Sequence, residues 1–559
     1  MTEPGIRDPT TPAGVPDAVL LRVLDTVLRE DILGLRSCAT RLERPDGTWL
    51  RTTAPDGGAW LLPVEPHGFQ SEFATRLPLI ESEATGTRLT DTDAVLATLR
   101  NLADPRDHAG FDDFAEECRQ EHAAARRHAS AGPAVRARLA RTRGDDPSRW
   151  TGLAAGPALD TLAAYVHHPV HPTSHARSGL DDHTLRRHAP EHHPVFALRW
   201  IAMERERLTG AGTLPTDWPT LGELDLPHSD RTHLALPVHP ATLPLLPDDV
   251  VRAPHPYLDV IPTLSMRTVA SIADPRTHLK LPLPTATLGL RNRRTVTRGS
   301  LIDGAAGQRL LRAVLDRVPR FRDRVLLADE QTWVHAGDDL VAVLVRRHPT
   351  GLDGALVLPV AALLAPGPDG VRVLDRVADR FHGGDRIALL DAYLTLLLDW
   401  QTTLFRYGVA LESHPQNLSL VLAPDRPPRL LLKDNDSPRV NTTRCPLPHG
   451  DFDDPRTFTT SDEPLASLFI TITVHLCVGA IAFALAPNER ERLLLLAHDR
   501  LAELADPTLR RHILEAERLP VKAMVTAGTL LTKQRSGAAD VNKHYNTGPN
   551  YLRRAHTAR

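Results

Sequence analysis

The feature that most constrains the fold is a short stretch in which two apolar runs lie between clusters of polar residues. Residues 412–436 read ESHPQNLSLVLAPDRPPRLLLKDND. The apolar runs at 418–422 and 430–432 flank a proline-rich segment at 423–428, a pattern that predicts a β-hairpin. Because antiparallel strands bring their outer ends together, the polar residues before the first strand should lie beside those after the second.

The open end of this hairpin would gather many polar side chains. They are Glu412, His414, Gln416, Asn417, Lys433, Asp434, Asn435 and Asp436. Hard oxygen ligands that converge in this way suit Mg²⁺ held together with substrate phosphates. Protein kinases use a similar layout, with an Asn before a hairpin and an Asp after it. A surface hairpin with polar ends explains the same spacing, so both interpretations stay open at this point.

Size and composition indicate a globular protein of several domains. The chain has 559 residues, which at roughly 150 residues per domain predicts three or four domains. The net charge of −3 gives no sign of a nucleic-acid partner. The four cysteines are far apart and form no CxxC pair, and the polar N-terminus is unlike a signal peptide. We therefore expect a cytoplasmic protein without a disulfide framework.

One apolar segment is long enough to cross a membrane. Residues 466–486 contain no Asp, Glu, Lys or Arg over 21 positions. We favour a buried helix, because Thr471, Thr473 and His475 interrupt the apolar run and the preceding segment is acidic rather than basic. No membrane partner is therefore expected.

Lysine is rare in this chain. Of 66 basic residues, only five are lysine, namely Lys280, Lys433, Lys522, Lys533 and Lys543. Lysine offers a compact ammonium whose pKa is easily adjusted, which arginine cannot replace. We expect some of these positions to be functional, although chance retention explains single cases.

Residues 1–155 are expected to be mostly helical. Apolar spacing predicts helices at 16–29, 91–102 and 111–141, the last broken at Gly132-Pro133, and a hairpin at 49–63. No residue cluster in this region points to chemistry.

A histidine-rich segment follows at residues 167–179, HHPVHPTSHARSG. Its prolines block a regular helix. His168, His171 and His175 are candidate metal ligands, but no carboxylate or cysteine lies inside the segment. Imidazoles beside Arg177 also suit phosphate or carboxylate recognition, which we favour.

Two predicted strands carry candidate phosphate ligands. A strand at 258–268 would place Ser265 and Arg267 on one face, and a strand at 278–283 would present Lys280. Arginines follow at 291, 293 and 294. A hydroxyl beside several cations makes a phosphate clamp. No glycine-rich phosphate loop is present, so side chains would have to bind the phosphates.

The C-terminal part combines helices with a polar end. A long amphipathic helix is predicted at 386–406, directly before the hairpin stretch. The last segment, from Val521 onwards, is rich in turns and contains three of the five lysines. It either closes over a site or is a frayed tail.

The order of these motifs resembles a known family. HPxHPxxxxRxG is followed by PTLSxRT, HLKLxL with a downstream RRT, ESHxQN, KDND and a terminal NxxPNYL. This order is similar to that of the IucA/IucC family, the NRPS-independent siderophore (NIS) synthetases. The resemblance covers roughly residues 160–552 and rests on the ordered set, because each motif alone is weak.

The resemblance implies an α+β fold of thumb, fingers and palm, with a palm similar to protein kinases. We accordingly predict a helical thumb-like domain at 1–155, a β-rich fingers-like domain at 156–345 and a palm-like domain at 346–559. It also implies an ATP- and Mg²⁺-dependent ligase that adenylates a carboxylic acid, such as citrate, a citrate derivative or a succinyl-hydroxamate acid. An amine or alcohol then attacks, and AMP and pyrophosphate are released. A homodimer is implied as well.

Roles follow by position in the motifs. The implied nucleotide ligands are Ser265, Arg267, Lys280, Arg294, His168, His171, His414, Gln416, Asn417 and Asp434. Arg267, Lys280, Arg294 and His414 would be catalytic. The implied Mg²⁺ ligands are Glu412, Asn417 and Asp434. Candidate substrate ligands are His175, Arg177, Thr285, Thr287 and Lys522.

The sequence departs from the family pattern at several positions. The family usually has Lys where His175 stands, Gly where His167 stands and Arg where Lys433 stands. The RRT arginine lies farther beyond Lys280 than expected, so Arg291 or Arg293 can replace Arg294. A change at position 175 points to a different carboxylate substrate. The alternatives are a kinase-like phosphotransferase and the same ligase chemistry in another natural-product pathway.

Overall fold

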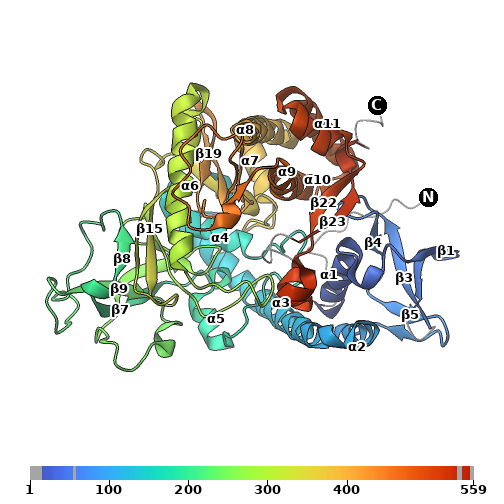
Figure 1. Cartoon of the computed structure of the whole chain (residues 1–559), viewed down its shortest axis with the longest axis horizontal. Coiled ribbons are helices and arrows are strands. Elements are labelled where there is room, and N and C mark those ends of the chain that lie inside the picture. The colour runs from blue at the N-terminus through green and yellow to red at the C-terminus, as the bar shows by residue number, and fades with distance from the viewer. Residues whose placement is uncertain (1–14, 54–57, 538–543, 554–559) are drawn as a thin grey trace.

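The computed structural model describes residues 15–53, 58–537 and 544–553. In Figure 1 the N-terminal region lies at one end of the molecule and the large central sheet at the other, with the C-terminal helices between and above them. Mixed helices and strands make up every part.

The N-terminal region packs three helices against a small sheet. The helices are α1 (Val15–Arg29), α2 (Thr92–Leu102) and α3 (His108–Arg143). The sheet has the order β1-β2-β3-β5-β6, with β4 paired to β3; its strands are β1 (Thr40–Arg44), β2 (Gly47–Thr53), β3 (Ala59–Pro66), β4 (Phe73–Thr75), β5 (Ile80–Ser82) and β6 (Arg88–Leu89). Apolar residues of α1 at 3.6-residue spacing fill the core between the layers. The predicted helices and hairpin are confirmed.

Helix α3 runs without interruption through Pro133, so the predicted break at Gly132-Pro133 is wrong. Proline removes one backbone hydrogen bond, but it does not stop a helix whose other bonds and packing hold it. Near the other end, Gly110 faces the C-terminal segment so closely that a Cβ there would lie 2.0 Å from the carbonyl oxygen of Leu530. A glycine is therefore needed at this contact.

The central region is built on an eight-stranded sheet with the order β8-β14-β15-β12-β11-β10-β7-β9. Its strands are β7 (Phe196–Glu204), β8 (Thr209–Ala211), β9 (His233–Val238), β10 (Tyr257–Pro262), β11 (Thr268–Ser271), β12 (Thr277–Lys280), β14 (Asp329–His335) and β15 (Ala342–Arg347). Short helices α4 (Gly156–Ala163) and α5 (Asp182–His188) precede it, and α6 (Arg298–Arg317) lies beside it.

The candidate phosphate ligands Ser265 and Arg267 lie in a turn rather than on one strand, so their predicted strand placement is wrong. Strand β10 ends at Pro262 and β11 begins at Thr268. The Ser265 hydroxyl accepts a hydrogen bond from the Thr268 backbone N–H at 3.2 Å, and Met266 has a φ of 64°. Serine favours such local side-chain bonds, which compete with strand pairing.

The predicted hairpin is confirmed. Strands β18 (Leu418–Ala423) and β19 (Arg426–Leu432) pair antiparallel, with Leu418 opposite Leu432. The turn is shorter than expected, because β19 already begins at Arg426. The four-stranded sheet β13-β19-β18-β16 also contains β13 (Val325–Leu327) and β16 (Leu356–Pro359).

Helices cover this sheet and form the largest core. They are α7 (Val373–His382), α8 (Arg386–Arg406), α9 (Glu463–Phe469), α10 (Ala480–Phe483), α11 (Pro487–Leu504) and α12 (Pro507–Arg510). The long apolar segment forms one helix over Glu463–Phe483, with a π-helical stretch at Ile470–Gly479. Most of it is buried inside the protein, which confirms a core helix. Alone among the described helices, it is long and apolar enough to cross a membrane.

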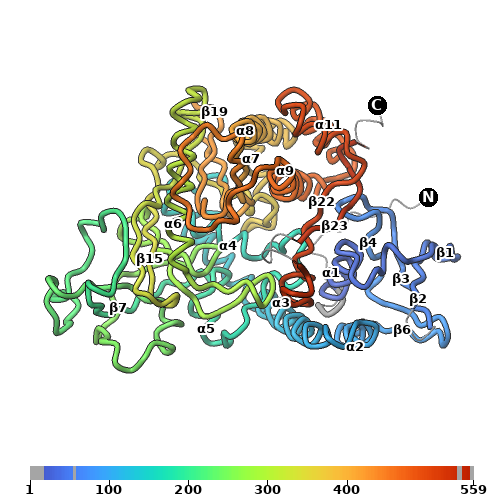
Figure 2. Tube along the Cα trace, in the orientation of Figure 1, coloured from blue at the N-terminus to red at the C-terminus, as the bar shows by residue number. Residues whose placement is uncertain are grey.

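The described C-terminal residues are anchored. Strands β22 (Arg518–Lys522) and β23 (Tyr545–Pro549) form a hairpin, and a π-helical turn at Thr526–Leu530 and α13 (Lys533–Ser536) lie between them. A small sheet of β17 (Val409–Ala410), β20 (Arg439–Asn441) and β21 (Phe458–Thr459) completes the fold. Figure 2 shows the C-terminal trace passing between the N-terminal region and the rest. The frayed-tail alternative is thus wrong for these residues.

Candidate anion-binding site

The open end of the β18–β19 hairpin forms one side of the site. The Lys433 backbone N–H donates to the Asn417 carbonyl at 3.1 Å, which extends the ladder past the last strand pair. The Asn417 side-chain amide lies 3.3 Å from Nε2 of His414. Burial lowers the pKa of His414, so its imidazole is neutral at pH 7. The polar residues on both sides of the hairpin therefore meet as the pattern predicts.

Asp434 links the hairpin to the central sheet. Its carboxylate accepts a hydrogen bond from Lys280 on β12, and Arg346 on β15 lies 3.4 Å away. Its backbone N–H donates to the buried Glu330 at 2.9 Å, and its φ of 61° lies in the left-handed region. Burial alone would raise the pKa of Asp434, but Lys280 and Arg346 outweigh burial and lower it.

Three arginines gather beside this pair with no counter-ion of their own. In the described parts of the chain, none of Arg177, Arg267 and Arg294 has a carboxylate within 4.0 Å. Arg294 is half-buried, and desolvation together with repulsion from Arg267 and Arg177 lowers its pKa to about 9. Guanidinium groups that repel one another in a half-buried place are stabilised when an anion binds between them.

Neutral histidines form the next part of the wall. His168 is half-buried, and Nδ1 of its ring accepts hydrogen bonds from the backbone N–H groups of Val170 and His171 at 3.3 and 3.1 Å. Its proton is therefore on Nε2. Burial and the charges of His171 and His414 lower its pKa, which places His168 near the hairpin end. Burial lowers the pKa of His171 to about 3.

Lys522 reaches the site from the C-terminal hairpin. Its ammonium donates to Glu412 at 3.1 Å from the end of β22. The electrostatic neighbours of His414 include Glu412, Asp434, Lys522 and Arg294, so these groups share one space. Two of the five lysines, Lys280 and Lys522, thus pair with carboxylates of the hairpin end. Lys433 is half-buried, and the charges of Asp160 and Arg346 act on it.

Other predicted residues lie at the edge of the site or away from it. The Thr285 hydroxyl donates to the Ser178 carbonyl at 2.8 Å, and the Thr287 hydroxyl accepts from Arg294. His175 faces Glu121 on α3 instead, with Nδ1 3.1 Å from Oε1. Gln416 is half-buried at the hairpin end. These threonines therefore position the loop and Arg294.

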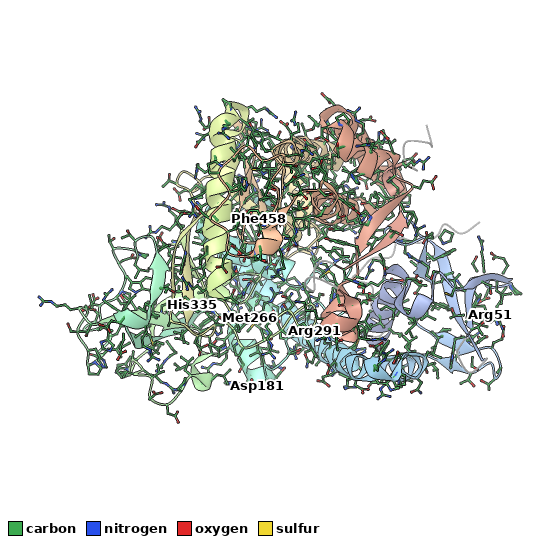
Figure 3. The ribbon with its side chains drawn as sticks, in the orientation of Figure 1. Arg51, Asp181, Met266, Arg291, His335 and Phe458 are labelled. Atoms are coloured by element: carbon green, nitrogen blue, oxygen red, sulfur yellow. The ribbon has the colours of Figure 1, made fainter. Side chains whose placement is uncertain are left out.

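Arg291 binds the C-terminal segment rather than the cation cluster. Its guanidinium donates to the carbonyls of Ala527, Thr529 and Leu531, so it caps the π-helical turn of the C-terminal segment. Figure 3 shows Arg291 beside this segment. Of the arginines considered after Lys280, it is Arg294 that lies in the cation cluster.

Sequence reasoning missed three residues of the site. Arg29 comes from α1, is buried, and donates to the Val170 carbonyl and to Thr26. Glu330 and Arg346 come from β14 and β15 and pair with each other beneath Asp434. A basic residue at the end of an apolar helix and charges on otherwise apolar strands were the available signals.

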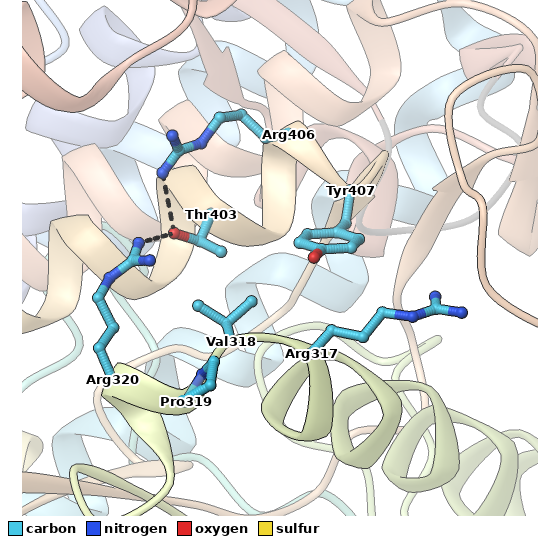
Figure 4. Close-up of a pocket in the computed structure, with 7 residues that line it drawn as sticks. All are labelled: Arg317, Val318, Pro319, Arg320, Thr403, Arg406 and Tyr407. Carbon is cyan, nitrogen blue, oxygen red and sulfur yellow. Dashed lines mark hydrogen bonds between the residues drawn. The ribbon is translucent and has the colours of Figure 1, made fainter.

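A separate pocket of about 460 Å³ lies at the ends of α6 and α8. Figure 4 shows it lined by Arg317, Val318, Pro319, Arg320, Thr403, Arg406 and Tyr407. The Thr403 hydroxyl accepts hydrogen bonds from Arg320 and Arg406. Arg320 is paired with Asp399, and all three arginines are exposed, so this pocket lacks the half-buried, unpaired cations of the site above.

The fold and the site together place a cluster of unpaired arginines beside the contact between two sheets, and comparisons with known proteins show what the chain resembles. Residues 159–365 match the IucA / IucC family, and residues 388–535 match the family described as ferric iron reductase FhuF-like transporter. The region over residues 159–365 is therefore similar to the IucA/IucC family, the NIS synthetases. The chain is 23% identical over 450 residues to staphyloferrin B synthase of Staphylococcus aureus, covering 70% of this chain and 75% of that protein.

Solved structures share the fold. The petrobactin biosynthesis protein AsbB of Bacillus anthracis superposes with a TM-score of 0.75 at 17% identity, covering 97% of this chain and 96% of that one. The ATP-bound aerobactin synthetase IucA of Klebsiella pneumoniae gives 0.69 at 17% identity, covering 96% and 99%. A shorter match is to L-2,3-diaminopropanoate–citrate ligase of S. aureus, which is 28% identical over 141 residues, covering 21% of this chain and 23% of that protein.

Proposed function

We propose that this protein is an ATP-dependent ligase that adenylates a carboxylic acid and joins it to an amine or alcohol in siderophore biosynthesis. The observation that carries the proposal is the cluster of half-buried arginines, without counter-ions among the described residues, beside the Lys280–Asp434 pair. Three neighbouring cations of this kind favour a bound anion, and a triphosphate supplies several negative charges. The relatives, which include a siderophore synthase and an ATP-bound aerobactin synthetase, support the same activity.

The triphosphate would lie between the turn after β10, the end of β12 and the loop before α6. Arg267, Lys280 and Arg294 face this space, and Ser265 lies in the same turn as Arg267. His168, His171, His414 and Gln416 would line the nucleotide from the other side. The positive charges would stabilise the charge that develops on the phosphoryl oxygens during transfer.

The hairpin end offers the hard oxygen ligands that Mg²⁺ prefers. Asp434, Glu412 and the Asn417 amide would hold the ion with the phosphates, and Mg²⁺ would polarise the phosphoryl oxygens. Both carboxylates form ion pairs with lysines, Asp434 with Lys280 and Glu412 with Lys522. The donor chemistry fits the ion, and these lysines would turn to the phosphates when it binds.

The chemistry needs positioning more than a protein nucleophile. An oxygen of the substrate carboxylate attacks the α-phosphorus, the bond from that phosphorus to the bridging oxygen breaks, and pyrophosphate leaves. The amine then attacks the acyl carbon and loses a proton while AMP leaves. Nε2 of neutral His414 is a suitable acceptor for that proton. Lys522 and Arg177 would bind the acid, with Thr285 and Thr287 at the edge of the acid site.

We also propose a thumb, fingers and palm at 1–155, 156–345 and 346–559, with a kinase-like palm, and a homodimer in the cytoplasm. Light scattering of the purified protein tests the dimer. The ligase chemistry is not tied by the site to iron uptake, so another natural-product pathway remains the second possibility for the same reaction.

Product analysis tests the proposal. The protein is incubated with ATP, Mg²⁺, hydroxylamine as trap and citrate, 2-oxoglutarate, succinate or a succinyl-hydroxamate. We expect AMP, pyrophosphate and a hydroxamate with one of these acids. ADP and a phosphorylated product would indicate the kinase-like alternative instead.

A further inference from the structure

A second polar cluster lies buried between α3 and the histidine-rich segment, apart from the triphosphate site. Its centre is Glu121, whose side chain is fully buried. Oε1 of Glu121 lies 3.1 Å from Nδ1 of His175 and 3.4 Å from Nδ1 of His167. The three candidate ligand atoms all lie within 4.8 Å of one another. The missing carboxylate of the histidine-rich segment is thus supplied by a helix about 50 positions earlier in the chain.

These spacings suit one metal ion. Zinc binds imidazole nitrogen and carboxylate oxygen at roughly 2.0–2.1 Å in tetrahedral geometry, so neighbouring ligand atoms lie roughly 3.3 Å apart. The distances from Oε1 of Glu121 to Nδ1 of His175 and Nδ1 of His167, 3.1 and 3.4 Å, are close to this value. Nδ1 of His167 is a buried polar atom without a hydrogen-bond partner in the part of the chain that the structure describes, and the His175 side chain is 5% exposed. Such orphan atoms are rare in folded proteins and need an explanation.

The surroundings carry additional negative charge. His128 packs edge-on against His175, with ring centroids 4.7 Å apart, and His128 lies 3.6 Å from the buried Glu191. Oε2 of Glu191 has no hydrogen-bond partner. Two buried carboxylates therefore face three imidazoles, and the charge of Arg177 also acts on Glu191 and His175.

Arg22 on α1 provides one positive charge in the present arrangement. Its Nη2 lies 3.3 Å from Glu121, and its Nη1 lies 3.3 Å from Nε2 of His167. If Nδ1 of His167 binds a metal, Nε2 must carry the proton and can no longer accept from Arg22. The Arg22 side chain is 22% exposed and has a route to solvent. Arg22 and a metal ion would therefore compete.

We propose that Glu121, His167 and His175 form a binding site for a divalent transition-metal ion of the zinc class, with Arg22 as its internal competitor. Two imidazoles and one carboxylate leave a fourth position for water. The ion would tie α3 to the segment that carries His168, His171 and Arg177. It is separate from the Mg²⁺ proposed at Asp434, and it does not depend on the ligase activity.

Metal binding to the whole purified protein tests this site. The protein is stripped with a chelator and titrated with Zn²⁺ against a fluorescent zinc indicator, with Co²⁺ absorption as a second probe. We expect one equivalent of Zn²⁺ bound in competition with the indicator and a Co²⁺ spectrum of tetrahedral type. Glu121→Gln and His175→Gln should each weaken Zn²⁺ binding at least about tenfold, because three ligands become two.

Arg22→Gln gives the sharpest result, because it should strengthen Zn²⁺ binding by roughly tenfold through loss of a competing charge. His183→Gln, an exposed histidine on α5, is the matched control and should leave binding unchanged. Circular dichroism and a melting curve show that each variant is folded. Equal Zn²⁺ affinity in wild type, Glu121→Gln and His175→Gln, or weaker binding by Arg22→Gln, would overturn the proposal. The latter result would mean that Arg22 holds the cluster as a purely hydrogen-bonded network.

Discussion

The ammonium of Lys280, at the end of β12 in the central sheet, donates a hydrogen bond to the carboxylate of Asp434, which follows β19 in the other sheet. The two residues are 154 positions apart. Asp436 lies 3.3 Å from the same ammonium, and Arg346 completes the group around Asp434. This contact joins the two sheets at the place where the unpaired arginines gather, so its removal should affect chemistry more than folding.

Lys280→Met should abolish adenylation while leaving the protein folded. The methionine keeps the length of the side chain, and Arg346 still pairs with Asp434. Loss of one charge aimed at the developing phosphoryl charge costs about 10²–10³ in kcat for comparable groups. Pyrophosphate release measures the rate, and circular dichroism measures the fold. Unchanged turnover in this variant would show that Lys280 does not act in the triphosphate site. The control Lys533→Met, at an exposed lysine, should retain full activity.

Arg294→Met should stabilise the protein without ligand and prevent its stabilisation by ATP. Its half-buried guanidinium lies near Arg267 and Arg177, and its pKa of about 9 reflects desolvation and repulsion from these two arginines. Removing it relieves the repulsion, so we expect a higher Tm in the absence of ATP and no Tm increase with ATP and Mg²⁺.

Arg291→Met is the matched control for that variant. Its hydrogen bonds to carbonyls of the C-terminal turn are lost, which should lower Tm and leave the ATP-induced shift in place. If both variants lose Tm equally and both still respond to ATP, the arginine cluster has no special role in binding the nucleotide.

Tyr551→Phe should destabilise the C-terminal hairpin. Nε2 of His475 donates to the Pro520 carbonyl at 3.0 Å, so its Nδ1 accepts from the Tyr551 hydroxyl at 2.9 Å. The variant leaves a buried acceptor unpaired, which costs about 1–3 kcal/mol of unfolding free energy. Because Pro520 lies on the strand that ends at Lys522, kcat/KM should fall as well. Urea unfolding measures the unfolding free energy. The control Tyr257→Phe, at a residue that is 41% exposed, should change neither the unfolding free energy nor kcat/KM.

Stability should decrease as the pH falls below about 6.5, the pKa of unfolded histidine. Burial lowers the pKa of His475 to about 4 and that of His239 to about 3. Between these values and 6.5 the unfolded chain binds protons that the folded chain does not, so acid favours unfolding. Within that pH window, each such histidine lowers the free energy of unfolding by about 1.4 kcal/mol for each unit by which the pH falls. At pH 7.5 and above both states are neutral at these rings and the effect is absent.

Urea midpoints measured at pH 7.5, 6.5 and 5.5 check this dependence. His239→Asn retains an acceptor for the Ala241 backbone N–H and should reduce the slope by about one proton. A slope identical to that of the wild type would show that His239 is protonated in the folded protein.

Local patterns determined many elements of this protein. The alternation around 418–432 predicts β18 and β19, and helical spacing predicts α1, α2 and α8, because side-chain periodicity reflects which face is buried. The polar clusters at the two hairpin ends meet because the strands between them pair. A local signal misled where an individual side chain mattered, as with Ser265, whose hydroxyl favours a turn over a strand.

Only the tertiary structure decided which distant charges meet. Nothing near Asp434 in the sequence indicates that Lys280, Arg346 and Glu330 surround it, since they come from three strands of another sheet. Arg294 rather than Arg291 joins the cation cluster because the close packing of the C-terminal turn takes Arg291. Sequence patterns thus determined the elements and their polar ends, whereas long-range packing selected the partners of each charge.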